Sequence, residues 1–396
     1  MLHMTDVDDD AWREIAAQWS IAPGVTYLNH GSFGPPPRPL LEAREVWLRR
    51  VAGNPMEYLT RGIEQDRYLG EARQSLASLV GCSSDDLAFV ENSTVGMNIV
   101  ANSFSLSPGD RVLATDHEYG AVLRLWEGVC AKAGAQLIVR SLSYPIENDE
   151  ALVAQLFAEC DERTKLLIVS HVTSPTAVVL PLERICAKAR RRGIAVCVDG
   201  PHAIAMREVN LQSLDCDFYV ASLHKWLCAP FGTGFLYVHP RRQDAIRPLV
   251  ISWGRTPPGV AKSWRDEFFW LGTRDPTGYL CVPAAIEFLA NVGWERFRER
   301  THQLAKYAKD LIVELTGLPP FTPDDVQWYG SMIALPLPDG DAPSLQRELV
   351  RRYGIEIPII PWQGRRFVRP SCHLYTKRQH LEQLRDALHE LLAEKH

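Results

Sequence analysis

The chain has 396 residues, of which 46% are apolar and 23% charged, a balance typical of a globular protein long enough for two domains. The formal net charge is −5 and no long basic run occurs, which argues against nucleic acid or an anionic membrane surface as the main partner. No apolar run approaches the roughly 20 residues of a membrane-spanning helix, so we expect no membrane partner.

Nine cysteines are scattered singly and none forms a C-x-x-C pair, so we expect no structural zinc site. Their odd number favours reduced thiols and a cytoplasmic location. The first ten residues are acidic and lack an apolar core, unlike a signal peptide.

The N-terminal part of the chain predicts a short helix within 11–20, followed by a rigid loop over 27–37 that contains Asn29, His30 and Gly31. Amphipathic helices are predicted at 38–52 and 61–80, and Gly81 ends the second of them.

Short apolar segments alternate with helices between residues 87 and 240. The predicted strands span 87–90, 111–114, 136–139, 165–170, 194–198, 218–221 and 234–238, and helices are predicted at 119–134, 149–160 and 181–192. This alternation predicts a mostly parallel α/β sheet flanked by helices, with its functional groups at the carboxyl ends of the strands.

The pattern changes after residue 282. Helices are predicted at 283–292, 296–316 and 377–394, and short strands near 331–336, 355–358 and 366–369. We therefore expect an N-terminal arm and active-site loop at 1–35, a large α/β domain at 36–282 and a smaller α+β domain at 283–396.

Two of the predicted strands end at residues suited to imine chemistry. Lys225 follows the strand at 218–221, and Asp199 directly follows the strand at 194–198. A lysine amine can lose its proton by desolvation and attack a carbonyl. A carboxylate can keep a pyridine nitrogen protonated, so the pair indicates a pyridoxal 5'-phosphate (PLP) site in which Lys225 holds the aldehyde carbon.

A phosphate cradle is predicted where the strand at 87–90 meets the next helix. Ser93 and Thr94 supply hydroxyls there, together with the free N–H groups of a helix N-terminus. Taken alone, the segment is better explained as a plain N-cap, and the presence of Lys225 and Asp199 shifts the interpretation toward a phosphate site. Ser222 and His224 flank the lysine and could also donate to phosphate.

Further polar side chains follow other predicted strands. His117 could stack on a flat cofactor ring, or simply be a hydrogen-bonded loop residue. Thr173 and Ser174 could reach the phenolic oxygen of the cofactor, or form a turn before Pro175. His202 could bond the same oxygen. The joint occurrence of these groups at strand ends carries the interpretation, because no single one is specific.

With these residues in view, the chain resembles the class V aminotransferase superfamily of the fold type I PLP enzymes, and within it the isopenicillin N epimerase-like branch. The shared stretches run in the order of the family over nearly the whole chain: YLNHGSFG at 27–34, DHEYGA at 116–121, SHVTSPT at 170–176, VDGPHA at 198–203, SLHKWL at 222–227, GTRDP at 272–276 and RPS at 369–371.

The resemblance implies a role for each matching residue. Lys225 would be linked covalently to the cofactor, Asp199 would pair with its ring nitrogen, and His117 would stack on the ring. The phosphate would be held by Ser93, Thr94, the amide of Val95, Ser222 and His224, and the phenolic oxygen by Thr173, Ser174 and His202.

Gly272 and Thr273 would reach across a homodimer to the phosphate of the partner. An amino-acid substrate would meet Asn29, His30 and Gly31, with its carboxylate on Arg369, whose planar guanidinium suits a bidentate contact.

Two positions depart from the family pattern. Pro201 stands where a small residue usually follows Asp-Gly, which puts the direction of His202 in doubt. Thr376 and Lys377 stand where the family often has Asn-Thr, and we expect that change to alter a helix cap rather than the chemistry.

The resemblance implies a reaction at the α-carbon of an amino acid or amino-acid derivative, and an epimerase or racemase is the leading hypothesis. A second acid or base opposite Lys225 would be His30, Tyr119 or a water. A C–S lyase, a transaminase or a decarboxylase needs no such group, and each stays an alternative. A cysteine desulfurase is disfavoured, because no cysteine precedes Arg369 in the segment 355–369 and Cys372 follows it.

Two readings from other classes are weaker. A non-catalytic PLP-fold binding module is at odds with the intact Lys225, Asp199 and Arg369. A nicotinamide-binding enzyme lacks the G-x-G-x-x-G turn after its first strand. Arg255 and Arg274 could recognise a second carboxylate or form ordinary ion pairs.

Overall fold

The computed structural model describes residues 8–61, 66–143, 145–254 and 263–394. Its centre is a seven-stranded sheet in the order β2-β8-β7-β6-β5-β3-β4. The strands are β2 (Leu87–Val90), β3 (Arg111–Thr115), β4 (Gln136–Arg140), β5 (Thr164–Ser170), β6 (Ala195–Asp199), β7 (Phe218–Ser222) and β8 (Gly234–Val238). Strands β4, β3, β5, β6 and β7 pair in parallel, and β8 is antiparallel to both of its neighbours. The predicted mostly parallel α/β sheet is confirmed.

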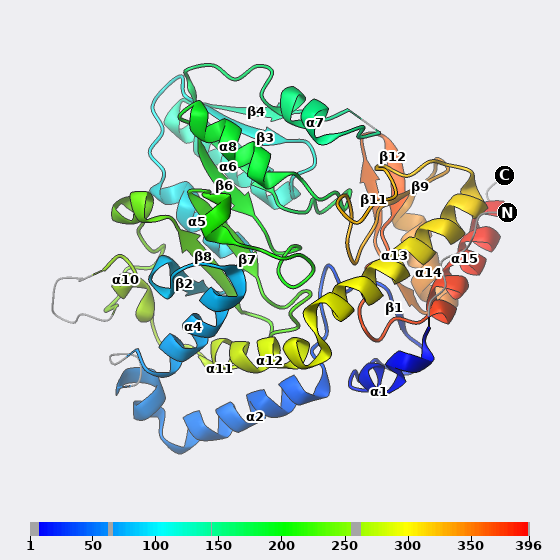
Figure 1. The fold of residues 1–396 in the computed structure, drawn as a ribbon, viewed down its shortest axis with the longest axis horizontal. Coiled ribbons are helices and arrows are strands. Elements are labelled where there is room, and N and C mark those ends of the chain that lie inside the picture. The colour runs from blue at the N-terminus through cyan, green and yellow to red at the C-terminus, as the bar shows by residue number, and fades with distance from the viewer. Residues whose placement is uncertain (1–7, 62–65, 144, 255–262, 395–396) are drawn as a thin grey trace.

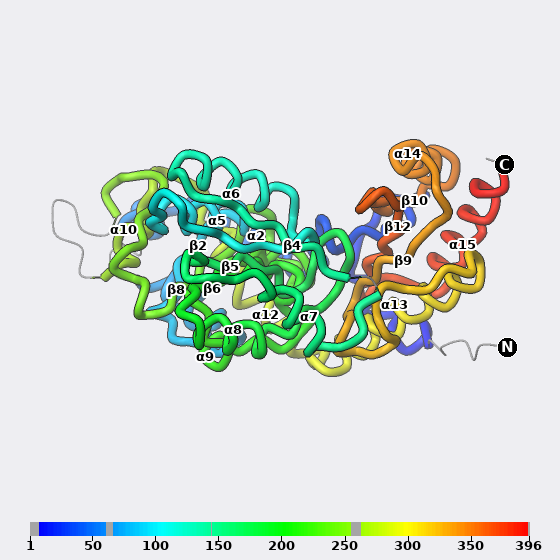
Figure 2. Tube along the Cα trace, turned by 90° about the horizontal axis from the view of Figure 1, so that it is seen from above, coloured from blue at the N-terminus to red at the C-terminus, as the bar shows by residue number. Residues whose placement is uncertain are grey.

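Helices cover both faces of this sheet, as Figures 1 and 2 show. Helices α5 (Ser93–Ser103) and α6 (Gly120–Ala133) lie on one face, and α7 (Asp149–Leu156), α8 (Leu182–Arg191) and α9 (Leu211–Leu214) lie on the other. Successive residues of β5 alternate between the two cores: Leu166 and Ile168 pack with α5 and α6, whereas Leu167 and Val169 pack with α8. Burial on both faces explains why the strands read as continuous apolar runs.

The remaining helices of the large domain pack beside the sheet or along its edge. They are α2 (Arg38–Gly53), α4 (Tyr68–Val80), α10 (Asp266–Phe269), α11 (Thr277–Leu280) and α12 (Val282–Val292). Helix α4 begins later than the predicted 61–80, after a short π-helical segment at Glu57–Arg61, and residues 62–65 of that prediction lie outside the described residues. No helix in the described ranges is long and apolar enough to cross a membrane.

The C-terminal part forms a smaller α+β unit at one end of an elongated molecule (Figure 2). Its helices are α13 (Trp294–Thr316), α14 (Ala342–Tyr353) and α15 (Arg378–Ala393). A three-stranded antiparallel sheet has the order β11-β12-β9, made of β9 (Leu335–Leu337), β11 (Ile359–Trp362) and β12 (Arg365–Val368). Helix α14 lies where the sequence predicted no element.

The N-terminal segment joins this smaller unit rather than the large sheet. After a 3-10 turn at Asp10–Trp12 and the short helix α1 (Arg13–Ala16), strand β1 (Thr26–Tyr27) pairs in parallel with β10 (Ile355–Glu356). The Ser371 amide donates to the Leu28 carbonyl at 2.9 Å. The loop after β1 is thereby brought to the junction of the two units.

Candidate active site

A cavity of about 390 Å³ opens at the carboxyl ends of β5, β6 and β7, beside the N-terminus of α5. Ten of the predicted site residues line it: Gly31, Ser93, Thr94, Ser174, Asp199, His202, Ser222, His224, Lys225 and Arg369. Asn29, His30, Val95, His117, Thr173, Gly272 and Thr273 are not among its lining residues.

Lys225 and Asp199 come together because their strands are neighbours in the sheet. Strands β6 and β7 run parallel, with Cys197 opposite Phe218 and Asp199 opposite Val220, so both strands end at the same edge. The Lys225 amine lies 2.9 Å from Nε2 of His202, which follows β6. The lysine therefore points into the cavity beside the aspartate, as the spacing of the motifs predicted.

Burial changes the charge state of both groups. Desolvation lowers the pKa of Lys225, the nearby Asp199 raises it in part, and Arg369 lowers it further. Burial also raises the pKa of Asp199, against the opposing effect of Lys225. Among the described residues the Oδ1 atom of Asp199 has no hydrogen-bond partner. A protonated ring nitrogen is the kind of ligand atom that would satisfy it.

The N-terminus of α5 has the form of an anion site. Asn92 caps the helix, because its Oδ1 accepts the Val95 amide at 3.0 Å. The Ser93 amide and hydroxyl both lie 2.9 Å from the Ser222 hydroxyl, which ties the helix start to the end of β7. A Cβ on Gly234 would lie 2.7 Å from the Ala221 carbonyl oxygen and 3.0 Å from the Asn92 Cα, so the absence of a side chain at Gly234 favours this close approach. Hydroxyls and helix N–H groups at one point suit a phosphate, but the Val95 amide is already used by the cap.

His117 and Thr173 do not line the cavity, and both contact the Thr176 hydroxyl. The His117 Nδ1 atom lies 2.6 Å from the Thr176 hydroxyl, and the imidazole packs 4.6 Å from the Trp362 ring. The Thr173 hydroxyl is occupied by Thr176 at 2.6 Å and by the Val178 amide at 2.8 Å. Neither side chain reaches the cavity in this arrangement, whereas Tyr119 from the same loop as His117 does. The expected stacking and hydrogen-bonding roles of His117 and Thr173 gain no support here.

Arg369 is a buried cation that lines the cavity. Its Nη1 donates to Ser174 and its Nη2 to the Ser32 hydroxyl at 3.2 Å, and all of these acceptors are neutral oxygens. Burial lowers the pKa of the guanidinium to about 10, which leaves it charged at neutral pH. A buried positive charge held by neutral groups is suited to a carboxylate.

Within the segment Asn29-His30-Gly31, Gly31 lines the cavity and the other two residues do not. Gly31 lines the cavity, and a Cβ there would lie 3.0 Å from the Ser371 hydroxyl. His30 lies behind Lys225 instead: its Nε2 is 3.0 Å from the Lys225 carbonyl oxygen and its Nδ1 is 3.1 Å from the Tyr375 hydroxyl. The prediction of a substrate contact for His30 therefore gains no support.

Several lining residues went unpredicted as parts of a binding pocket. They are Ser32, Phe33, Asn92, Val122, Ser170, Val172 and Pro201, with Tyr119 considered only as an acid or base. Most of these residues lie one or two positions from a predicted site residue. Their closeness in sequence to a strand end was therefore the feature that could have predicted them as lining residues. Gly272 and Thr273 lie outside the cavity of this single chain.

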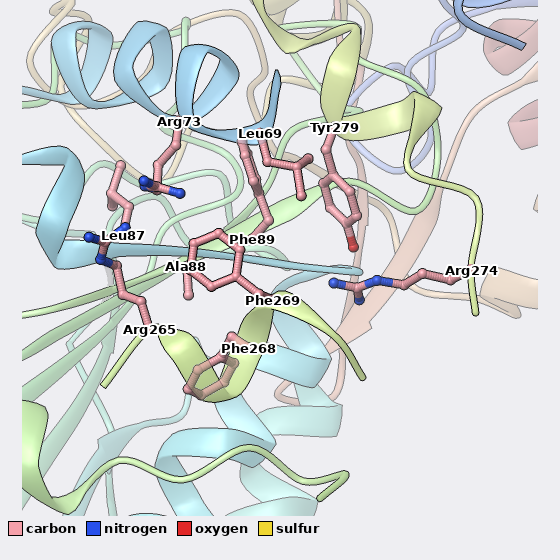
Figure 3. A pocket seen from close by; sticks show the side chains of 10 residues that line it. All are labelled: Leu69, Arg73, Leu87, Ala88, Phe89, Arg265, Phe268, Phe269, Arg274 and Tyr279. Carbon is pink, nitrogen blue, oxygen red and sulfur yellow. The ribbon is translucent and has the colours of Figure 1, made fainter. Parts of the chain in front are cut away.

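A second, much smaller cavity of about 30 Å³ lies among α4, α10 and α11 (Figure 3). Phe89 and Phe269 line it together with three arginines. Each arginine is paired with a carboxylate: Arg73 with Asp66, Arg265 with Asp85 and Arg274 with Glu91. Arg274 is thus an ion-pair partner in this structure, and Arg255 lies outside the described residues.

Solved structures share this architecture from end to end. The chain superposes on the cysteine desulfurase CsdA from Escherichia coli with a TM-score of 0.81, covering 97% of this chain and 98% of that one at 22% identity. A mutant of C-DES with glycine covalently linked to its PLP cofactor superposes with a TM-score of 0.82, covering 97% and 100% at 22% identity. The fold is therefore that of the fold type I PLP-dependent enzymes.

The sequence comparison gives the family. The sequence model of Aminotransferase class-V matches residues 26–385, and the chain belongs to that family. Isopenicillin N epimerase of Amycolatopsis lactamdurans is 37% identical over 96% of this chain and 98% of the relative, and that of Streptomyces clavuligerus is 35% identical over 97% and 99%. L-cysteine desulfhydrase of Arabidopsis thaliana is 28% identical over 93% and 88%.

The protein is thus a PLP-dependent enzyme, and the cavity fits that cofactor. Asp199 offers an unpaired buried oxygen for the ring nitrogen, the start of α5 offers hydroxyls for the phosphate, and Lys225 offers a desolvated amine between them. The Nδ1 atoms of His202 and His224 are also buried without a partner in the described part of the chain.

Proposed function

We propose that the protein epimerises or racemises an amino acid or amino-acid derivative at its α-carbon. The full-length identity of 37% and 35% to two isopenicillin N epimerases carries this proposal. The cavity supports it, since it places a desolvated lysine and a carboxylate-binding arginine in one enclosed space.

Nine of the residues that line the cavity receive a role in this proposal. The bound cofactor supplies the electron sink for a bond broken at Cα. Lys225 holds the cofactor and its Nζ removes the Cα proton, because a desolvated amine is a competent base near neutral pH. Asp199 keeps the ring nitrogen protonated, and Arg369 fixes the substrate carboxylate. Ser93, Thr94, Ser222 and His224 bind the phosphate, and Ser174 and His202 bind the phenolic oxygen.

Inversion at Cα needs a proton donor on the face opposite Lys225, and we assign that role to the Tyr119 hydroxyl. Tyr119 lines the cavity and is 50% exposed, so its hydroxyl is accessible to a bound substrate. It follows β3, whereas Lys225 follows β7, and β5 and β6 lie between these strands. His30, a candidate on sequence grounds, is fully buried and bonded to the Lys225 backbone.

Incubation with candidate amino acids in D2O tests the reaction directly. We expect a substrate to exchange its Cα proton for deuterium and to change configuration. A Tyr119→Phe variant should keep the exchange and lose inversion by about 100-fold, since general acids contribute factors of that order. The proposal fails if no candidate amino acid exchanges its Cα proton or changes its configuration, and the enzyme releases sulfide or a keto acid instead.

A C–S lyase is the second candidate, favoured by the relationship to L-cysteine desulfhydrases at 26–29% identity. Release of sulfide from cysteine without Cα inversion would indicate it. A desulfurase acting through Cys372 is less compatible with the position of that residue. The Cys372 thiol is fully buried, its pKa is raised to about 12 by burial, and no described cysteine lines the cavity.

We further propose a cytoplasmic homodimer whose active sites lie at the subunit interface, with Gly272 and Thr273 reaching the phosphate of the partner. The nine cysteines are all unpaired, as expected in a reducing compartment. Light scattering of the purified protein tests the dimer. In mixed dimers of a Thr273→Ala chain and a Lys225→Ala chain, a shared site predicts that one of the two sites regains wild-type PLP affinity. Mixed dimers in which neither site regains it would contradict the shared site.

A further inference from the structure

The backbone that carries Lys225 turns sharply and needs external support. The lysine loop, which we define as Lys225–Ala229, follows β7, and Cys228 in it adopts φ +58°, a left-handed conformation that non-glycine residues rarely adopt. Within the loop the Cys228 amide donates to the Lys225 carbonyl at 2.9 Å. The Ala229 amide also donates to the Leu223 carbonyl at 3.1 Å, which closes the loop onto the end of β7. Side-chain donors to the Lys225 and Trp226 carbonyls add to these backbone bonds and help decide where the lysine points.

Two histidines from distant parts of the chain provide that support. The Nε2 of His30 lies 3.0 Å from the Lys225 carbonyl oxygen, and the Nε2 of His373 lies 3.2 Å from the Trp226 carbonyl oxygen. Carbonyls only accept, so both imidazoles carry their proton on Nε2. The Tyr375 hydroxyl, 3.1 Å from the His30 Nδ1, donates to it and reinforces this tautomer.

The two imidazoles also stack, and no polar solvent reaches them. Their ring centroids are 4.0 Å apart with planes 19° from parallel, and the Trp226 ring lies 5.4 Å from His30 on a similar plane. Both histidines are fully buried. Their segments are tied together by the bridge between Asn29 and Ser371, so the two rings approach the lysine loop as one unit.

The position of Gly34 shows how closely the segment that carries His30 packs against the lysine loop. A Cβ at Gly34 would lie 2.5 Å from the His224 carbonyl oxygen, 2.6 Å from the His30 Nε2 and 2.7 Å from the Lys225 carbonyl oxygen. Real Cβ atoms do not approach backbone oxygens so closely. Glycine is therefore required for the arm to reach the loop.

A metal ion is the competing explanation, because the Cys228 sulfur lies 3.6 Å and 3.5 Å from the Nε2 atoms of His30 and His373. The ring geometry rules it out. An imidazole binds a metal in its own plane, and two nearly parallel rings stacked 4.0 Å apart cannot both direct an in-plane lone pair at one ion. Both Nε2 atoms are also protonated toward carbonyls, and burial raises the pKa of the Cys228 thiol.

We propose that His30 and His373 are positioning residues that clamp two successive carbonyls of the lysine loop and so orient the Lys225 amine in the cavity. The clamp comes from the N-terminal arm and from the segment after β12, whereas the loop belongs to the large domain. The orientation of Lys225 is thus coupled to the seating of the smaller unit. This inference does not depend on which bond at Cα is broken.

Paired substitutions separate the hydrogen bond from the ring. His30→Phe and His373→Phe keep an aromatic ring for the stack and remove the donor. His30→Gln and His373→Gln remove the ring and keep an amide donor near the Nε2 position. His302→Phe is the matched control, since His302 is a histidine of helix α13 that packs on Tyr329 and not in the stack of His30, His373 and Trp226.

Two readouts do not depend on turnover. In the full-length purified protein, hydrogen exchange of the 223–231 peptide should be about threefold to tenfold faster in the Phe variants, the factor expected for one lost hydrogen bond. In the PLP-loaded protein, the pH midpoint of the visible cofactor band should shift by about half a unit or more, because the amine is misplaced. The Gln variants and His302→Phe should stay within about twofold of the wild-type exchange rate.

Turnover gives the third readout. The Phe variants should lower kcat by about tenfold while KM changes less than about threefold, since substrate contacts are untouched. The proposal is overturned if the Phe variants match His302→Phe in exchange and titration. Should the Phe variants fail to fold, the Gln variants decide: loop exchange as slow as in the wild type supports the clamp, and faster exchange overturns it. Stoichiometric zinc in the purified protein that His373→Phe removes would also overturn it.

Discussion

At the scale of single residues, the site depends on charges that are buried and incompletely paired. Asp199 and Arg369 both line the cavity, one with an unpaired oxygen and the other with only neutral acceptors. Such groups cost stability without a ligand and favour binding of a complementary one. The cavity is therefore prepared for a cation-bearing ring and a carboxylate-bearing substrate.

Arg369→Lys tests the carboxylate contact. Lysine keeps the positive charge and loses the planar fork, so we expect KM for the amino-acid substrate to rise by about tenfold to a hundredfold with a smaller change in kcat. Arg365→Lys at the start of β12, the strand that precedes Arg369, changes an exposed side chain and should leave both constants unchanged. Steady-state kinetics measure the difference, and an unchanged KM in Arg369→Lys would contradict the assignment.

The sequence predicted most of the cavity at this scale but not the direction of each side chain. Asp199 and Lys225 could be placed because carboxyl ends of parallel strands meet at one edge. His30 and His117 lie in equally recognisable motifs, yet their rings turn toward Lys225's backbone and toward Trp362. Those directions depend on the smaller unit, which lies more than 200 residues away in sequence.

At the scale of elements, the strands were predictable because each is buried on both faces and reads as an apolar run. Helix α14 was missed although its ends carry signals: Asp341 caps it, Pro343 lies in its first turn and Gly354 ends it in the left-handed conformation.

The predicted strand at 355–358 is interrupted in the structure, where β10 and β11 are separated by Ile357 and Pro358. Proline removes a ladder hydrogen bond, which explains the break.

The start of helix α5 gives a test at this scale. Asn92→Ala removes the acceptor for the Val95 amide and should cost about 1 kcal/mol of stability, as N-cap losses do. It should also weaken PLP binding, because the helix start is expected to hold the phosphate. Asn148→Ala removes the same kind of cap from α7, where Asn148 accepts the Ala151 amide at 2.9 Å.

The two variants should therefore lose similar stability in thermal unfolding and differ in cofactor affinity. Fluorescence titration of the cofactor-free protein with PLP measures that affinity. Equal PLP affinity in Asn92→Ala and Asn148→Ala would separate helix capping from phosphate binding and contradict the assignment.

At the scale of the whole molecule, the fold keeps several histidines neutral in its interior. Burial lowers the pKa of His171 and His373 to about 3 and holds the pKa of His30 and His202 well below the usual value. In the unfolded chain these groups titrate near 6.5, so the unfolded state binds more protons below that pH. Burial acts oppositely on Glu118, whose pKa it raises to about 7, and on Asp199.

The four histidines take up protons on unfolding and the two carboxyl groups release them, so the unfolded state binds more protons in total. The free energy of unfolding should therefore fall as the pH drops through 6.5. We expect a loss of about 2–4 kcal/mol between pH 6.5 and 5, given about 1.4 kcal/mol per net proton and pH unit. Thermal unfolding of the cofactor-free protein across this range measures it. A His171→Gln variant should show a shallower dependence, and a melting temperature constant from pH 7 to 5 would contradict the account.

The central claim is that Lys225 carries the cofactor, and one measurement tests it most directly. Borohydride reduction of the PLP-saturated protein, followed by proteolysis and peptide mass mapping, should find the reduced cofactor on Lys225 and leave the exposed Lys132 unmodified. A reduced cofactor on any other lysine, or an unmodified Lys225 in saturated protein, would contradict the account.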